Sequence, residues 1–195
     1  MLRANPLSMR ERGIVLISSL LLLLVLTILG LSMFRSVGLQ EKIAGNLREK
    51  HRALQAAESA QQFAEWWLTQ NRNYKTAVTT CSILQNANQG DASVCLNTLP
   101  SVVANVATVP WKIGGVPVGV SYTPPGMSIA TPGMGTYVQQ PVFYISQLGT
   151  SATGQGTVFQ IDAVGYGATT DAIAVVESTY VVFNGTCSLD PNDPC

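Results

Sequence analysis

The chain has 195 residues, and its 11 lysine and arginine residues balance its 11 aspartate and glutamate residues. Only 11% of the residues are charged, against about 25% in an average protein. This composition excludes a polybasic nucleic-acid-binding protein and an acidic disordered tail, so we predict no direct binding of nucleic acid.

A charge-free stretch from Gly13 to Phe34 determines the broad class of the protein. The apolar run 14–34 spans roughly 31 Å as a helix, which is the thickness of a bilayer's hydrocarbon core. It is longer than the apolar part of a cleaved secretory signal. Arg3, Arg10 and Arg12 precede it and favour a cytoplasmic N-terminus. We therefore predict a single-pass transmembrane helix over 14–34, with the bulk of the chain outside the cytoplasm.

The helical pattern continues through 35–71, where small and apolar residues recur at spacings of three, four and seven. Charged residues occupy the other side, so this segment is predicted as an amphipathic helix continuous with the membrane span. We expect one helix from Ile14 to about Asn71. Its apolar face, Leu54–Leu68, is the only large one available to cover a sheet. Trp66 and Trp67 are interpreted as part of that packing.

The remaining chain is predicted to be irregular first and β-rich afterwards. Residues 72–140 form an irregular connecting region, with a strand-like run at Lys112–Tyr122 and a loop at Thr123–Gln140 rich in proline and glycine. Residues 141–195 are predicted as an antiparallel β-meander with a disulfide-stapled tail. Its strands are expected at Val142–Leu148, Val158–Tyr166 and Ala172–Phe183.

In the middle strand, apolar Phe159 and Ile161 alternate with polar Gln160 and Asp162, as in a half-buried antiparallel strand. The predicted fold class is therefore α+β: a long N-terminal helix, with a transmembrane half and an amphipathic half, packed on an antiparallel β-sheet.

Four cysteines lie beyond the membrane span: Cys81, Cys95, Cys187 and Cys195. None stands in a Cys-x-x-Cys motif and His51 is the only histidine, so the spacing does not predict a zinc site. Three disulfide pairings are possible. Proximity in the sequence favours Cys81–Cys95 and Cys187–Cys195 as structural disulfides.

No catalytic constellation emerges from the sequence. With one histidine, a Ser-His-Asp or Cys-His arrangement is not predicted. Asp162, Asp171 and Glu177 could supply a carboxylate pair, but exposed strand and turn positions explain them equally well. A solvated tail explains the acidic and amide residues near the C-terminus better than a calcium loop does: Asp190, Asn192 and Asp193. We predict no enzyme, no cofactor and no metal.

Four N-terminal segments carry a family resemblance: Glu11–Ser18, Leu29–Leu31, Glu41–Leu47 and Leu54–Glu58. Together they resemble a type IV pilin, in particular the PilX group of minor pilins. A weaker similarity to the same group is found in three β segments: Phe143–Leu148, Val164–Ala168 and Glu177–Tyr180. The resemblance implies a type IV pilin-like fold and a non-enzymatic part in a fimbrium that serves cell adhesion and twitching motility.

The resemblance also implies a processing pathway. Residues 1–13 would be a prepilin leader, cut after Gly13 by prepilin peptidase, which then methylates the new amine of Ile14. The implied location is the bacterial inner membrane with a periplasmic bulk, and afterwards the pilus filament on the cell surface. The implied partners are other minor pilins, the major pilin, the inner-membrane assembly platform and a tip adhesin.

One residue departs from the family pattern. Major pilins carry glutamate at the fifth mature position, which here is Ser18, and no acidic residue follows before Glu41. We hypothesise that the protein sits at or near the filament tip and primes assembly. The alternative for Ser18 is that it simply tolerates lipid and helix packing.

The alternative functions are a general-secretion pseudopilin and a membrane-anchored extracytoplasmic binding protein or enzyme. The genomic neighbours of the gene would distinguish a pilus protein from a secretion protein.

Overall fold

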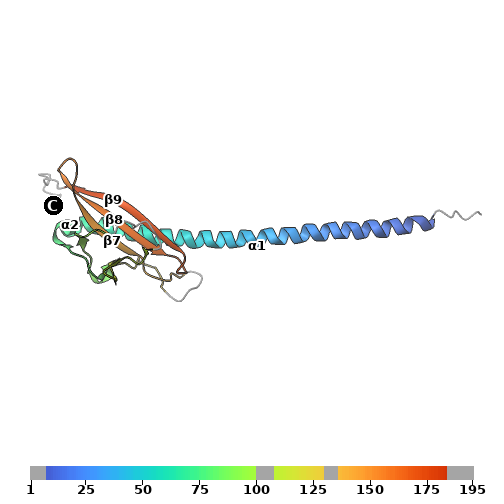
Figure 1. Cartoon of the computed structure of the whole chain (residues 1–195), viewed down its shortest axis with the longest axis horizontal. Helices are drawn as coiled ribbons and strands as arrows, with labels where there is room; N and C mark the ends of the chain where they lie inside the picture. Colours follow the sequence, from blue (N-terminus) through green and yellow to red (C-terminus); the bar gives the residue numbers. More distant parts are fainter. Residues whose placement is uncertain (1–7, 100–107, 130–135, 184–195) are drawn as a thin grey trace, which may run out of the picture. The chain divides into compact units, whose positions relative to one another are not determined.

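The computed structural model describes residues 8–99, 108–129 and 136–183, and for residues 8–12, 35 and 36 the backbone alone. The chain divides into two compact units, residues 1–46 and 47–195. Figure 1 labels α1, α2, β7, β8 and β9.

Helix α1 (Ser8–Thr69) has 62 residues and confirms the predicted long helix. A 3-10 turn, η1 (Gln70–Arg72), and a short helix, α2 (Asn73–Thr76), follow it. Asn71 and Arg72 adopt left-handed backbone angles, with φ of 48° and 59°. An α-helix cannot continue through two such residues, so α1 ends within two residues of the predicted end.

Three long strands form the main part of the sheet, side by side in Figure 1. They are β7 (Val142–Thr150), β8 (Gly156–Tyr166) and β9 (Ile173–Phe183). β8 pairs antiparallel with both neighbours, with Ile145 opposite Ile161 and Asp162 opposite Glu177. This confirms the predicted antiparallel meander, with β8 in its centre.

The connecting region contributes short strands to the same sheet, which is therefore mixed rather than purely antiparallel. The strands are β1 (Val78–Thr79), β2 (Leu84–Asn86), β3 (Val94–Cys95) and β6 (Gly119–Ser121), with a 3-10 turn, η2 (Ala87–Gln89), after β2. The pairs β1–β3, β2–β6 and β3–β7 are parallel, whereas β6 pairs antiparallel with β7.

The strand-like run at Lys112–Tyr122 contains three short strands rather than one continuous strand. Gly114 and Gly115 have φ of 58° and 85°, which glycine adopts readily and a strand interior does not. They turn the chain between β4 (Lys112–Ile113) and β5 (Val116–Pro117), which pair as a separate two-stranded sheet. β6 begins only at Gly119.

Both faces of the main sheet are covered in the globular unit. The face toward α1 packs through a core whose residues come from the helix and from the sheet: Ala60, Ala64, Leu68, Phe143, Ile145, Phe159, Ile161 and Ala163. The opposite, outer face is covered by the connecting region, in a second core: Cys81, Cys95, Leu99, Trp111, Val118, Val142, Tyr144, Val164 and Tyr166.

The helix face that covers the sheet is an alanine stripe rather than a leucine-rich surface. Five alanines of α1 are at most 1% exposed: Ala53, Ala56, Ala57, Ala60 and Ala64. Leu68 is also fully buried, but Leu54 is 36% exposed and Trp66 is 56% exposed, so the prediction that these two pack on the sheet is wrong. Trp67 is partly buried against the core, as predicted.

Gly165 of β8 explains why alanines line the helix. A Cβ atom built on Gly165 would lie 2.9 Å from the carbonyl carbon of Ala56, and closer still to backbone atoms of Ala53 and Ala57. Helix backbone and strand backbone therefore touch at this point. Small residues on both elements are the condition for so close an approach.

Candidate assembly surface

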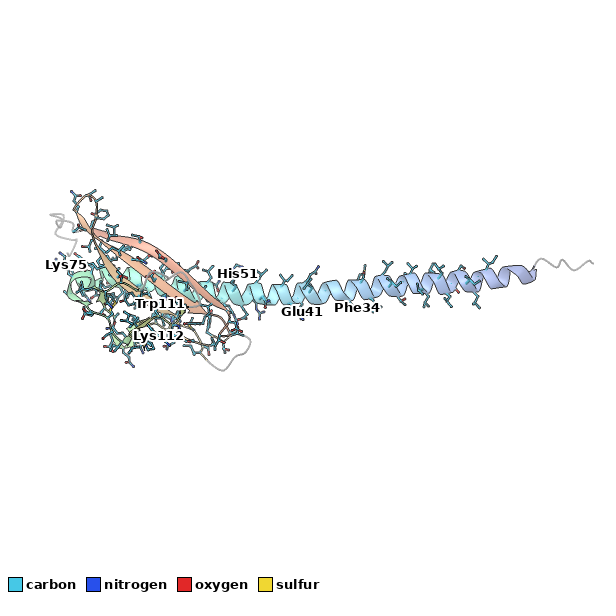
Figure 2. The ribbon with its side chains drawn as sticks, in the orientation of Figure 1. Phe34, Glu41, His51, Lys75, Trp111 and Lys112 are labelled. Atoms are coloured by element: carbon cyan, nitrogen blue, oxygen red, sulfur yellow. A yellow bond between two sulfur atoms is a disulfide. The ribbon has the colours of Figure 1, made fainter. Side chains whose placement is uncertain are left out.

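The apolar part of α1 exposes its side chains in the single chain. From Ile14 to Phe34 every described side chain except the intermediate Gly30 is exposed, with Ile14 at 69% and Phe34 at 79%. Phe34 projects from the helix in Figure 2. By length and composition this helix could cross a membrane. Such a surface is stable only against lipid or against other apolar helices, because water would hydrate it unfavourably.

The hydroxyl groups in this segment are satisfied within the helix. Ser18 Oγ donates to the Val15 carbonyl oxygen at 3.0 Å, Ser19 Oγ to that of Leu16 at 2.9 Å, and Thr27 Oγ1 to that of Leu24 at 2.8 Å. A polar group without a partner is costly in hydrocarbon, and these bonds remove that cost. The surface around Ser18 is thus apolar and uncharged.

The structure places the predicted processing residues inside α1. Gly13 and Ile14 are helical and exposed, and a Cβ atom on Gly13 would meet nothing within 4 Å. Ser18 lies one turn further along the same helix. Cleavage after Gly13 and methylation of Ile14 stay predictions.

One of the two favoured disulfides is present. Cys81 and Cys95 are bonded, with Cα atoms 5.3 Å apart, and both are buried in the outer core. Asn97 holds the same loop, because its side chain accepts from the Cys81 N–H and donates to the Cys81 carbonyl oxygen, both at 2.8 Å. The Cys187–Cys195 pairing lies outside the described residues, as do Asp190, Asn192 and Asp193.

Glu49 links α1 to the segment that directly follows β8. Its carboxylate accepts a hydrogen bond from the Ala168 backbone N–H at 2.7 Å and pairs with Arg52 at 3.2 Å. The Arg52 guanidinium also lies over the ring of Tyr137, 5.8 Å from its centroid. In the sequence, Glu49 is one of several charged residues on the polar side of the helix, and no spacing signal marks it.

An apolar groove lies beside this contact. Its volume is about 500 Å³, and Leu47, His51 and Leu54 of α1 line it together with Ile173 and Val175 of β9. His51 is exposed at its edge and is labelled in Figure 2. Leu54 thus lines this groove and does not belong to either core.

Asp162 is not the exposed strand residue that its alternation with Phe159 and Ile161 predicts. It is fully buried, because the connecting region covers the outer face of β8. The side-chain amide of Gln160 donates to both carboxylate oxygens, at 3.1 and 3.3 Å. Burial raises the pKa of Asp162 to about 6, the Gln160 hydrogen bond opposes the rise, and the Glu177 charge adds to it.

The three carboxylates considered together in the sequence do not form one site. Glu177 lies opposite Asp162 in the β8–β9 pair but is exposed, and Asp171 lies in the exposed turn between the two strands. Burial, and then the charge of Asp162, raise the pKa of the neighbouring Tyr144 to about 12. Among the described residues there is no group of three or more histidine, cysteine, aspartate or glutamate side chains that could hold a metal ion.

These features define the class of the protein. An N-terminal helix with an apolar first part, whose residues from Ala53 to Leu68 pack on a β-sheet, is an α+β, type IV pilin-like fold. Residues 12–61 match the family model described as PilX N-terminal. The N-terminal part of the chain is therefore similar to that of PilX-type type IV pilins. No curated protein and no solved structure matches the chain.

Proposed function

We propose that the protein is a minor pilin that helps to prime assembly of a type IV pilus, at or near the filament tip. The match to the PilX N-terminal family suggests a minor pilin of the type IV pilus, a structural rather than enzymatic component. The single observation that carries the finer proposal is the chemistry at Ser18. Its hydroxyl is bonded to its own helix, and the apolar segment around it has no carboxylate.

The physical argument concerns an ammonium group in an apolar surrounding. A mature N-terminal amine is charged, and a buried charge is stable only beside a partner of opposite sign. A glutamate at the fifth position supplies that partner and registers a subunit beneath an existing one. A subunit with nothing above it has no need of such a pair, and Ser18 cannot form one.

The same surface supports a location and a set of partners. Before assembly, the apolar side chains of 14–34 would face lipid in the inner membrane, with the β-rich unit in the periplasm. On entry into a filament they would exchange lipid for the helices of other minor pilins and the major pilin, guided by the assembly platform. Because lipid and helix surfaces are similarly apolar, packing and paired charges decide the geometry.

Ser18→Glu tests the tip placement. We expect the variant to move from the tip into the shaft, because the new carboxylate can pair with the amine of another subunit. Immunogold labelling of sheared pili from cells carrying either chain measures the position. Ser18→Ala, which removes the hydroxyl but adds no charge, should label like the unmodified protein. Unchanged piliation and unchanged tip labelling in Ser18→Glu would remove the support for the proposal.

The processing pathway is tested by intact mass and N-terminal peptide mapping of the protein from its native membrane. We expect a chain that begins at methylated Ile14. The Gly13→Ala variant serves as a control for the cleavage site, because Gly13 is the residue after which the family's peptidase would cut. A chain that still begins at Met1 would make the protein an ordinary membrane-anchored protein and would overturn the filament proposal.

A further inference from the structure

β9 is an edge strand of the main sheet, as Figure 1 shows. It has 11 residues, and within the described part of the chain it pairs only with β8. Alternate residues of an antiparallel strand direct their backbone groups to the same neighbour, so the remaining residues of β9 present N–H and C=O groups on the side away from β8. No backbone hydrogen bond among the described residues occupies that side. β9 is therefore a template for one more strand.

The sequence of β9 does not protect this edge. Natural edge strands are usually short, bulged or charged, or contain lysine or proline. β9 contains neither lysine nor proline, pairs with β8 without a register shift and carries one charge, at Glu177. Most of its residues are β-branched or aromatic, which are types that favour strands. Pairing with a further strand is thus favoured by the backbone and by the side chains.

The apolar groove of about 500 Å³ lies along this free edge. Its β-sheet wall is Ile173–Val175, and no residue of β8 lines it, so it opens on the side of β9 away from β8. The other wall is one face of α1, where Leu47, Lys50, His51 and Leu54 follow at helical spacing. A strand added to β9 would lie beside this groove, whose size is that of a binding pocket.

Side-chain directions define which position of an added strand would enter the groove. Even-numbered residues of β9 face α1, because Tyr180 and Val182 pack on the core between helix and sheet, and Ser178 Oγ donates to a carboxylate oxygen of Glu65 at 3.2 Å. Directly paired residues of neighbouring strands lie on the same face of a sheet. A residue opposite Ala174 would therefore point toward α1 and into the groove.

Two charges flank the position opposite Ala174. Lys50 is exposed and forms no ion pair with a described residue, and Glu177 is exposed on β9. Lys50 lies near the beginning of β9, because its neighbour Glu49 bonds to Ala168 before that strand. An antiparallel partner strand would thus meet Glu177 with an early residue and Lys50 with a late one. Opposite charges at these two positions would stabilise the pair.

We propose that β9 and this groove bind an extended segment of another protein chain as an antiparallel strand. The segment carries an apolar side chain opposite Ala174, a basic one opposite Glu177 and an acidic one that reaches Lys50. Main-chain hydrogen bonds supply the affinity, and the groove and the two charges select the sequence. This binding mode is independent of the proposed role at the filament tip.

The test uses the full chain in detergent and the peptide acetyl-Thr-Lys-Val-Thr-Leu-Thr-Glu-amide, whose lysine lies opposite Glu177 when its leucine lies opposite Ala174. The backbone amide resonances of β9 are followed by NMR. We expect saturable shifts in 173–178 and, at saturation, slower hydrogen exchange of the β9 amides that point away from β8. Slow exchange of these amides in the free chain would mean that another part of the chain, or a second copy, already covers the edge, and would overturn the proposal.

Peptides with N-methyl groups at alternate residues test strand addition itself. In one of the two possible sets, every methylated nitrogen faces β9 and has lost its proton, so binding should be lost. In the other set the methylated nitrogens face away, and binding should be kept. Equal affinity of the two peptides would contradict pairing with the edge.

Lys50→Glu tests the groove and the register. The peptide should bind this variant about 2- to 10-fold more weakly, as expected for an ion pair at a surface. A peptide with lysine in place of its glutamate should bind the variant better than it binds the unmodified chain. Lys42→Glu changes the same charge on α1 outside the groove and should bind both peptides like the unmodified chain. Shifts that do not saturate, or no exchange of preference between the two peptides, would overturn the proposal.

Discussion

The ionisable side chain of Asp162 is buried on the covered outer face of the sheet. The stability of the protein should therefore depend on pH. Its pKa is about 6 in the folded chain, against an ordinary value of 3.8. Between these values the folded state holds a proton that the unfolded state has released. Stability therefore falls as pH rises through this window, by about 3 kcal/mol in total. Urea unfolding of the full chain in detergent, at pH 4 and pH 7.5, measures the change.

Asp162→Asn separates this effect from the other titrating groups, because asparagine resembles the protonated carboxyl group at every pH. The variant should be more stable than the unmodified chain at pH 7.5, and most of the difference should be lost by pH 4. Asp171→Asn changes the same charge at an exposed turn and should produce no such difference. A pH-independent gap between Asp162→Asn and the unmodified chain would contradict the explanation.

At the scale of elements, the contact between α1 and β8 depends on a glycine that faces a row of alanines. Gly165→Ala should destabilise the globular unit by about 3 kcal/mol, because the added methyl group meets backbone atoms that cannot rotate away. Denaturant unfolding, followed by near-UV circular dichroism, measures the loss.

Gly45→Ala is the matched control for this substitution. A Cβ atom on Gly45 would meet nothing within 4 Å, and alanine favours a helix by about 1 kcal/mol relative to glycine. This variant should be no less stable than the unmodified chain. Equal stability of Gly165→Ala and Gly45→Ala would show that helix and strand can separate without cost.

The elements that could be predicted from sequence are those long enough to show a period. The apolar run of α1, the alternation in β8 and the β-type runs of β7 and β9 each extend over many residues, and the structure contains these elements. Strands of two or three residues, such as β1 and β3, have no measurable period, and their parallel partners are set by the fold. The same limit explains Asp162: alternation placed it on the second face correctly, but only the tertiary structure shows that this face is covered.

The features of the candidate surfaces also differ in whether the sequence predicts them. The apolar segment around Ser18 and the Cys81–Cys95 pair follow from composition and spacing. The Glu49–Ala168 contact and the groove between α1 and β9 could not be predicted, because each joins residues far apart in the chain. No local sequence pattern indicates a contact between residues so far apart.

At the scale of the whole molecule, one helix belongs to both compact units, and its two parts should differ in local stability. Residues 41–46 expose every side chain, whereas residues 56–68 include most of the buried alanine stripe. Backbone hydrogen bonds open more readily where no side chain is packed. Hydrogen–deuterium exchange of the full chain should thus be faster in 41–46 than in 56–68. Equal protection in both parts would mean that packing on the sheet does not stabilise the helix.

The alanine stripe also has a consequence for the order in which the chain is made. The residues that cover α1 are synthesised long after the helix itself: Glu49 and Ala168 are 119 positions apart, and Glu65 and Ser178 are 113. Contacts of such separation form slowly, since a long loop must close first. While the ribosome adds the connecting region and the last strands, the small-residue face of the helix has no cover. The growing chain must therefore reach β8 before this half of the helix acquires its native environment.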